Sequence, residues 1–262
     1  MPITELPQTD DALYKYSLYF NRGRELEGEA AGSYLTTTFP KADILQFYLE
    51  DDLGAVSAVA LLRTINRSGA RIVSEGFSTP EKLKEAIAKC CNDKIDALVI
   101  WPGAAAGQVV ESLDLKKLEK AAEIVLPSDA ISHAAALDPK LNQRLRFIYP
   151  YEKPGVLHPR EFDVRAWMGS RRLPITNERV QFQTYYALTL IEHSLEHLLG
   201  DFNREYLIEL IEHEAEKNLN IGTYPTLALG PGQRFASKGA YVMRLDEKAE
   251  EGMAPVSEWI VP

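Results

Sequence analysis

Short apolar runs and helical patterns alternate along the first 150 residues of the chain. The apolar runs have the length of strands, and the segments between them carry apolar residues at the spacing of one helix face. The run 95–101 (IDALVIW) is almost entirely apolar, which is typical of a parallel strand covered on both faces. The predicted strands are 44–49, 70–73, 95–101, 123–126 and 145–149, and the predicted helices are 22–38, 53–68, 79–91 and 103–112.

The ends of two of these helices carry recognisable signals. Gly69 follows the helical pattern 53–68 where a C-cap glycine belongs. Thr79 and Pro80 open the next helix as an N-cap and a proline in the first turn. Strands alternating with helices in units of this length predict an α/β fold, a three-layer, doubly wound and mainly parallel sheet.

The rest of the chain has a different pattern. The region 158–217 reads as an additional helical region, with helices at 159–169, 178–199 and 203–217, and 220–262 returns to short strands broken by Pro and Gly. We therefore divide the chain into an α/β ligand-binding lobe over 14–150, a helical region over 158–217, and returning strands with a tail over 220–262. The segment 225–246 is expected to pack near the α/β lobe, and 15–20 (KYSLYF) to form a short strand.

Composition excludes several classes of protein. Hydrophobic residues make up 45% and charged residues 26%, as in globular proteins, and no apolar run approaches the roughly 18 residues that span a bilayer. A net charge of −9 argues against nucleic acid or an anionic membrane as partner. The N-terminus lacks the features of a signal peptide, so we expect a cytoplasmic protein or a mature product. Cys90 and Cys91 are adjacent, which disfavours a disulfide between them, and they match no metal-binding spacing.

Candidate ligand-binding loops follow from the predicted sheet. Ligands of open α/β sheets bind beyond the carboxyl ends of the strands, which here means the loops that begin at 50, 102, 127 and 150. The loop 102–107 (PGAAAG) has neither a dinucleotide fingerprint nor the lysine of a P-loop. Asp129 either holds a cationic group of the ligand or caps the helix that follows it.

One catalytic pattern stands out in the helical region. Residues 193–197 match H-x-x-E-H, the inverted zinc-protease motif, with His193 and His197 on one helix face. The same helix also reads as an ordinary amphipathic one, and we predict that the two histidines bind no zinc. Further zinc ligands would come from Glu192, Glu209, Glu212 and His213, whereas the competing apolar stripe consists of Leu188, Ile191, Leu195, Leu198 and Leu199.

Several stretches, in their order and spacing, resemble the second half of a known family. These stretches are 16–38, 43–75 (with its acidic-glycine loop), 94–113, VLPSDA at 125–130, and 222–245. They resemble the type I periplasmic solute-binding proteins, the branched-chain amino-acid receptor family of ABC importers. The resemblance implies two lobes joined by crossing strands, with a small ligand in the cleft between them, and a chain that begins at the second lobe.

The resemblance also implies the ligand-binding residues and a departure in specificity. The family's acidic-glycine loop carries an aromatic residue where this chain has Leu53, and an aromatic position after Gly103 is Ala104. Asp129 matches the family's acidic residue, while the small residues 104–106 leave room for a larger or less polar ligand. The expected ligand-binding residues are Leu53, Gly54, Trp101, Gly103, Ala104, Ser128 and Asp129.

The sequence thus predicts a non-catalytic, periplasmic solute-binding protein or a fragment of one, without cofactor or metal. Its expected partners are a small polar or amphiphilic ligand and an ABC permease, with neither nucleic acid nor membrane insertion. The alternatives are a zinc-dependent hydrolase that uses 193–197, and a cytoplasmic ligand sensor. An incomplete lobe leaves apolar surface, so we also expect a homo-oligomer or a complementing chain. The expected contact residues are Phe182, Tyr185, Tyr186, Leu190 and Leu207.

Overall fold

The computed structural model divides into two compact units. It describes residues 16–91, 93–114, 116–134, 137, 139–198, 200, 202–216, 222–249 and 252–262. The α/β unit comprises Gly23–Pro150 and Gly239–Pro262. The helical unit comprises Tyr151–Lys238 and the described part of Met1–Arg22. The unit boundaries therefore interleave along the chain, whereas the sequence pattern divides it into consecutive ranges.

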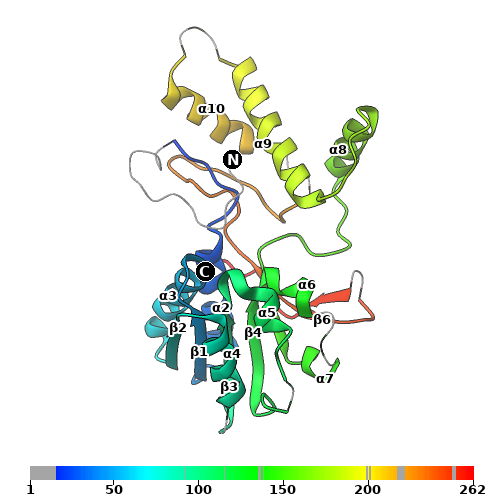
Figure 1. Cartoon of the computed structure of the whole chain (residues 1–262). Coiled ribbons are helices and arrows are strands. Elements are labelled where there is room, and N and C mark those ends of the chain that lie inside the picture. Colours follow the sequence, from blue (N-terminus) through cyan, green and yellow to red (C-terminus); the bar gives the residue numbers. More distant parts are fainter. Residues whose placement is uncertain are drawn as a thin grey trace. The chain divides into compact units, whose positions relative to one another are not determined.

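A seven-stranded sheet forms the centre of the α/β unit, in the order β2-β1-β3-β4-β5-β6-β7 (Figure 1). The first five strands in that order are parallel, and β6 and β7 add on antiparallel. This confirms the predicted α/β class, and the apolar strand 95–101 indeed lies between two parallel neighbours. The strands are β1 Asp43–Leu49, β2 Arg71–Phe77, β3 Ile95–Trp101, β4 Ala121–Pro127, β5 Leu145–Tyr149, β6 Tyr241–Leu245 and β7 Met253–Pro255.

Helices cover both faces of this sheet, and each face has its own apolar core. One face packs against α2 and α3, through a cluster that includes Leu35, Ile65 and Trp101. The other face packs against α4 and α5, through a cluster that includes Leu83, Val109 and Phe147. The helical segments of this unit are α2 Arg24–Thr38, α3 Asp52–Ser68, α4 Pro80–Lys89, η1 Gly103–Ala105, α5 Ala106–Val110, η2 Ser128–Ala130, α6 Ile131–Ala134 and α7 Pro139–Asn142.

The predicted helix ends have the expected local structure. Gly69 has φ 80° at the C-cap of α3, a conformation that glycine adopts without steric cost. The Thr79 side chain accepts a hydrogen bond from the Lys82 backbone N–H, and Pro80 lies in the first turn of α4. Cys90 and Cys91 follow that helix as free thiols.

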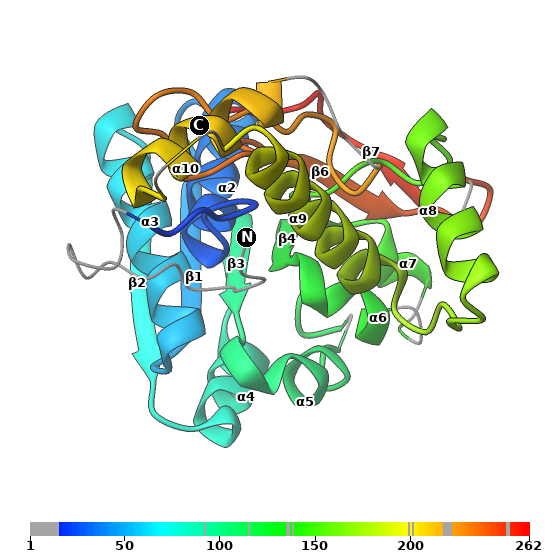
Figure 2. The same ribbon diagram turned by 90° about the horizontal axis from the view of Figure 1, so that it is seen from above.

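Two glycines allow α2 and α3 to lie against each other, as both views of the ribbon show (Figures 1 and 2). A Cβ atom at Gly28 would overlap the Ser57 carbonyl oxygen and lie 2.8 Å from the Ala60 Cβ atom. A Cβ atom at Gly32 would lie 2.6 Å from the Thr64 Cβ atom. The close approach of these helices therefore depends on the absence of side chains at both positions.

The helical unit contains three longer helices, as predicted, around a separate core. Tyr224 is central to that core, where its hydroxyl accepts a hydrogen bond from the Gln183 side chain at 2.9 Å and its ring stacks on Phe20. Tyr19 pairs with Phe235 in a parallel bridge, the described remnant of the strand expected at 15–20. The helices are α8 Pro159–Ser170, α9 Glu178–Glu196 and α10 Arg204–Glu216. None of the described helices is both long and apolar enough to cross a bilayer.

The predicted faces of α9 are wrong. Phe182, Tyr186 and Leu190, which we expected to contact another chain, are at most 3% exposed and form the core of the helical unit. Leu188 and Leu195, which we assigned to the interior, are 61% and 47% exposed. The helix carries apolar residues on two faces, so its periodicity did not determine which of them is buried.

The packing of α2 against α3 gives a first prediction. Gly28→Ala should lower the free energy of unfolding by about 1–3 kcal/mol, because the added methyl group overlaps backbone of α3. Gly169→Ala is the control, since a Cβ atom at Gly169 in α8 meets nothing within 4 Å. That control should be neutral or stabilise by up to about 1 kcal/mol. Denaturant titrations measure both, and equal effects of the two variants would contradict the role of Gly28.

Candidate functional site

The candidate site lies at the carboxyl edge of the sheet in the α/β unit. Strands β1, β3 and β4 are parallel neighbours and end at Leu49, Trp101 and Pro127. The loops that follow them therefore emerge at the same edge, where α/β proteins bind their ligands.

Asp51 joins the first two of these loops. One carboxylate oxygen accepts a hydrogen bond from the Gly54 backbone N–H at 2.7 Å, which caps α3. The other accepts from the Ala104 backbone N–H at 2.8 Å, in the loop after β3. A Cβ atom at Gly103 would overlap this carboxylate, and Gly103 has φ 56°. Asp51 thus requires a glycine at position 103 and binds two of the loop N–H groups.

A network of buried charges holds the third loop against the start of α2. The Arg24 guanidinium forms an ion pair with Asp129 through Nη2 and donates from Nη1 to Glu27 at 2.8 Å. The second Glu27 oxygen accepts from the Ser128 hydroxyl at 2.6 Å and from the Ser128 backbone N–H at 3.4 Å. The side chains of Arg24 and Glu27 are each only 4% exposed. Because buried charges need partners, this network fixes Ser128 and Asp129 in place.

Burial changes the proton affinity of Glu27. Removal of this carboxyl from water raises its pKa above the usual value, and the nearby Asp129 carboxylate acts in the same direction. The Arg24 charge and the Ser128 hydroxyl oppose this shift by stabilising the carboxylate, without cancelling it.

The two parts of the site are also connected to each other. Ser57, one turn beyond Gly54 in α3, donates a hydrogen bond from its hydroxyl to the Arg24 carbonyl oxygen at 3.2 Å. Helices α2 and α3 are therefore joined at the edge of the sheet where the three loops emerge, and these three loops with the residues that hold them are called the wall.

The expected site residues fall into two groups by exposure. Leu53, Ser128 and Asp129 are half-buried and Ala104 is exposed, so a ligand can reach them, whereas Gly54 and Gly103 are buried. Trp101 was expected to contact the ligand, but its side chain is only 1% exposed and its indole N–H donates a hydrogen bond to the Gln46 side chain at 3.0 Å. The ring is part of the apolar core on the sheet face that packs against α2 and α3, and only the Trp101 backbone lies near Gly54 at the site. Of the two roles considered for Asp129, capping of the following helix is not seen, since the N-cap of η2 is Pro127 and no side chain forms a capping hydrogen bond there. Asp129 instead forms an ion pair with Arg24.

The residues of the zinc-protease motif belong to the helical unit, where 193–196 form the last turn of α9 and His197 is its C-cap. The Nδ1 atom of His197 lies 2.8 Å from the His193 carbonyl oxygen, an ordinary contact along a helix. Within the described ranges, no three His, Cys, Asp or Glu side chains group so that they could hold a metal ion.

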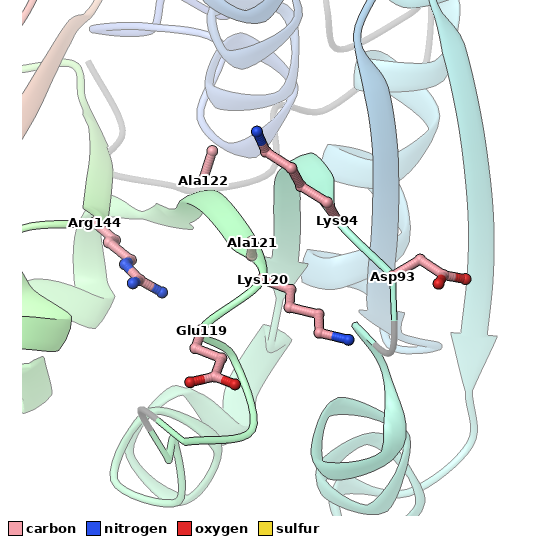
Figure 3. A pocket seen from close by; sticks show the side chains of 7 residues that line it. All are labelled: Asp93, Lys94, Glu119, Lys120, Ala121, Ala122 and Arg144. Atoms are coloured by element: carbon pink, nitrogen blue, oxygen red, sulfur yellow. The ribbon is translucent and has the colours of Figure 1, made fainter.

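A pocket of about 520 Å³ opens at the opposite, amino edge of the sheet (Figure 3). Its cationic side chains Lys94, Lys120 and Arg144 stand among the carboxylates of Asp93 and Glu119, around the start of β4. Arg144 donates to the Leu118 carbonyl oxygen at 3.2 Å. The nearly balanced charges are those of a solvated surface and favour neither an anion nor a cation strongly.

Comparison with known proteins gives matches among solved structures alone. No family model matches the sequence, and no curated protein matches it. A fatty acid ABC transporter substrate-binding protein from Thermomonospora curvata is similar with a TM-score of 0.66 at 16% identity, over 95% of this chain and 65% of that one. A branched-chain amino acid ABC transporter protein from Thermus thermophilus, with bound valine, has a TM-score of 0.68 at 12% identity, over 95% of this chain and 68% of that one.

A third solved structure is similar to a comparable degree. A possible leucine/isoleucine/valine-binding protein from Rhodopirellula baltica SH 1 has a TM-score of 0.61 at 14% identity, over 91% of this chain and 65% of that one. The fold is that of the type I periplasmic solute-binding proteins. This confirms the resemblance in fold, and the chain spans about two thirds of the length of these solute-binding proteins.

Sequence reasoning missed three residues of the wall: Arg24, Glu27 and Asp51. Asp51 had a local signal, since an aspartate three residues before a glycine at a strand-to-helix junction is a common N-cap. Arg24 and Glu27 have the i, i+3 spacing of a helical ion pair, but Asp129, the second carboxylate that pairs with Arg24, lies 105 residues away from it. Nothing local in the sequence indicates that this ion pair is buried.

The contact between Asp51 and Gly103 gives a second prediction. Gly103→Ala should destabilise the protein by about 2–4 kcal/mol, because it adds overlap with a carboxylate to a left-handed backbone. In an Asp51→Ala background the same change should cost only about 1–2 kcal/mol, the backbone part alone. A double-mutant cycle from denaturant titrations measures the coupling. Additive effects would show that the carboxylate does not restrict position 103.

The raised pKa of Glu27 gives a third prediction, on pH. A carboxyl whose pKa is higher in the folded protein stabilises it fully below the unfolded pKa of about 4.5, and this contribution is lost as pH rises through the folded pKa. The melting temperature of the wild type relative to Glu27→Gln should therefore decrease as pH is raised from about 4 towards 7. Differential scanning calorimetry at several pH values measures the difference. An increase over the same interval would mean that the Arg24 charge outweighs burial.

Proposed function

We propose that the chain is a non-catalytic solute-binding protein, or part of one, that takes a small polar or amphiphilic molecule for an ABC importer. The observation that carries this proposal is the wall itself, at the edge of the sheet where proteins of this fold bind ligands: Asp51 joins its first two loops, and the buried Arg24 and Glu27 hold the third. A site held in advance by such contacts loses little entropy when a ligand binds.

The chemistry of the wall limits the class of ligand. The Ala104 and Ser128 backbone N–H groups, which would suit a carboxylate, already donate to Asp51 and Glu27. Asp129 would suit an ammonium group, but Arg24 already neutralises much of its charge. A ligand therefore gains comparatively little from either end of an amino acid, and the methyl group of Ala104 with the side chain of Leu53 favours contact with an apolar group.

The proposal places the protein in the periplasm, with the permease of an importer as its partner. The similar structures are substrate-binding proteins of ABC transporters, one described for fatty acids and one with bound valine. Both ligands have an apolar part and a carboxylate, so they define the first compounds to test. We also propose that the chain assembles into a homo-oligomer or with a complementing chain.

A thermal-shift screen tests the proposed function. The compounds are L-valine, L-leucine, saturated fatty acids of increasing length, and the corresponding primary amides. A ligand present at 100 times its dissociation constant should add about 2.7 kcal/mol to the free energy of unfolding. We expect amides or fatty acids to give larger shifts than the amino acids, and calorimetric titration then gives the affinity. If none of these compounds stabilises the protein or gives heat on titration, the proposed ligand class is wrong.

Variants at opposite edges of the sheet locate the ligand and give a fourth prediction. Ala104→Trp should weaken binding by at least about tenfold, because the indole occupies the exposed position on the wall. Ala122→Trp is the matched control, an exposed alanine at the amino edge of the sheet that should leave the affinity unchanged. Affinity lost in Ala122→Trp and retained in Ala104→Trp would move the site to the other edge.

A further inference from the structure

Helix α9 has a second apolar face that stays exposed among the residues that the structure describes. Its first face, which includes Phe182, Tyr186 and Leu190, forms the core of the helical unit. On its second face Val180, Leu188, Ile191 and Leu195 are 39%, 61%, 38% and 47% exposed. A helix that is apolar on two faces is normally covered on both.

The second face is continuous along the helix. Val180, Thr184, Leu188, Ile191 and Leu195 follow one another at spacings of four, four, three and four residues, which aligns them in one stripe. Thr184 is exposed as well, and its hydroxyl donates back to the Val180 carbonyl oxygen, so the stripe presents methyl groups along its whole length. Such a stripe is the surface with which one helix packs on another.

The charges beside the stripe differ between its two ends, because the exposed Glu178 at the first end is already paired with Arg165 at 2.7 Å. Near the first half, Arg171 stacks on the Trp167 ring with 4.2 Å between the guanidinium carbon and the ring centroid, and Trp167 in turn contacts Tyr185 of α9. Arg171 and the following Arg172 are exposed. Beside the second half, the exposed charged residues include Glu192 and Glu196. When two copies of the helix lie antiparallel, the end of one copy that is near the arginines faces the end of the other copy that carries the glutamates, and these charges attract each other.

We infer that this face binds the same face of a second copy of the chain, with the two α9 helices antiparallel about a two-fold axis. If the axis passes midway between residues 189 and 190, Leu188 packs opposite Ile191 of the second copy and Thr184 opposite Leu195. The same arrangement brings the arginines near the first half of one helix towards Glu192 and Glu196 of the other. A single patch that complements itself is what a two-fold dimer requires.

This dimer is independent of the proposed ligand site. The stripe belongs to the helical unit and the wall to the α/β unit, and they share no residue. A negative result in the ligand screen therefore does not contradict the dimer, and a monomeric protein does not contradict the proposed ligand site.

Sedimentation velocity and equilibrium measure the assembly of the full chain, as a fifth prediction. At roughly 10 µM the wild type should sediment as a dimer. Ile191→Glu should raise the dimer dissociation constant by at least about a hundredfold, because it buries a charge at the centre of the interface. Leu157→Glu is the matched control, since Leu157 is 70% exposed in the same unit but outside α9. Far-UV circular dichroism spectra that match the wild type confirm that both variants fold, whereas the melting temperature of Ile191→Glu should fall because dimerisation stabilises the folded state.

A distance measurement tests the antiparallel register. Spin labels are placed singly at Glu192→Cys and Glu196→Cys, with Cys90 and Cys91 replaced by serine. In each variant the distance is measured between the label on one copy and the same label on the other copy. Because residues rise about 1.5 Å each along a helix, the component of this distance along the helix axis should be about 12 Å greater for the label at 196 than for the label at 192. Equal distances at the two positions would mean parallel helices and overturn the register. A monomeric wild type, or a dimer that Ile191→Glu leaves intact, would overturn the proposal itself.

Discussion

The buried guanidinium of Arg24 is the constraint on which the carboxyl edge of the sheet in the α/β unit, the candidate ligand-binding edge, depends. A cation that is 4% exposed is stable only where carboxylates and carbonyl groups approach it, so it determines where its neighbours lie. Glu27 comes from the same helix, and Asp129 comes from the loop after β4. The Arg24 carbonyl oxygen then accepts from Ser57, which ties α3 to the same point. Gly28 and Gly32 allow α2 to come this close to α3, and Arg24 and Glu27 lie buried at the start of the same helix α2. Helix packing and buried electrostatics therefore support each other at this edge.

A consequence for binding follows from where the carboxylates lie. Asp51 and Glu27 accept from loop N–H groups that a ligand anion would otherwise use, which makes the wall rigid and removes donors from it. Under the function proposed above, the site would offer fewer hydrogen bonds to a ligand and would be ordered before the ligand binds. Recognition at such a wall depends more on shape and apolar contact, at Ala104 and Leu53, than on ion pairs. The half-exposed Asp129 remains the polar group best placed to orient a ligand, with its charge reduced by Arg24.

The sequence predicted the parallel part of the fold well, because each element there is specified by its own residues. The apolar run 95–101 matches β3 at both ends, and Gly69 and Thr79–Pro80 mark helix ends by local chemistry. It did not predict that β6 and β7 extend the same sheet, since the partner of an added strand is chosen by long-range pairing. At the site, the loops were predicted from topology, while the pairing of Arg24 with Asp129 and the inward orientation of the Trp101 ring were not. Both depend on which residues far apart in the chain become buried together, and neither helical nor strand periodicity contains that information.

The two units differ in how completely they bury their helices, and this difference explains why α9 misled the sequence interpretation. In the α/β unit both faces of the sheet have helices against them, so the apolar side of each helix is the side that is buried. In the helical unit the core forms on one side of α9, around Tyr186 and Tyr224, and the apolar residues of the other side remain exposed. Periodicity in the sequence reports where apolar residues lie on a helix, but the number of partners decides which face is covered within one chain. The stripe that the described residues leave exposed is therefore the basis of the dimer proposed above, whereas the covered face is part of the fold.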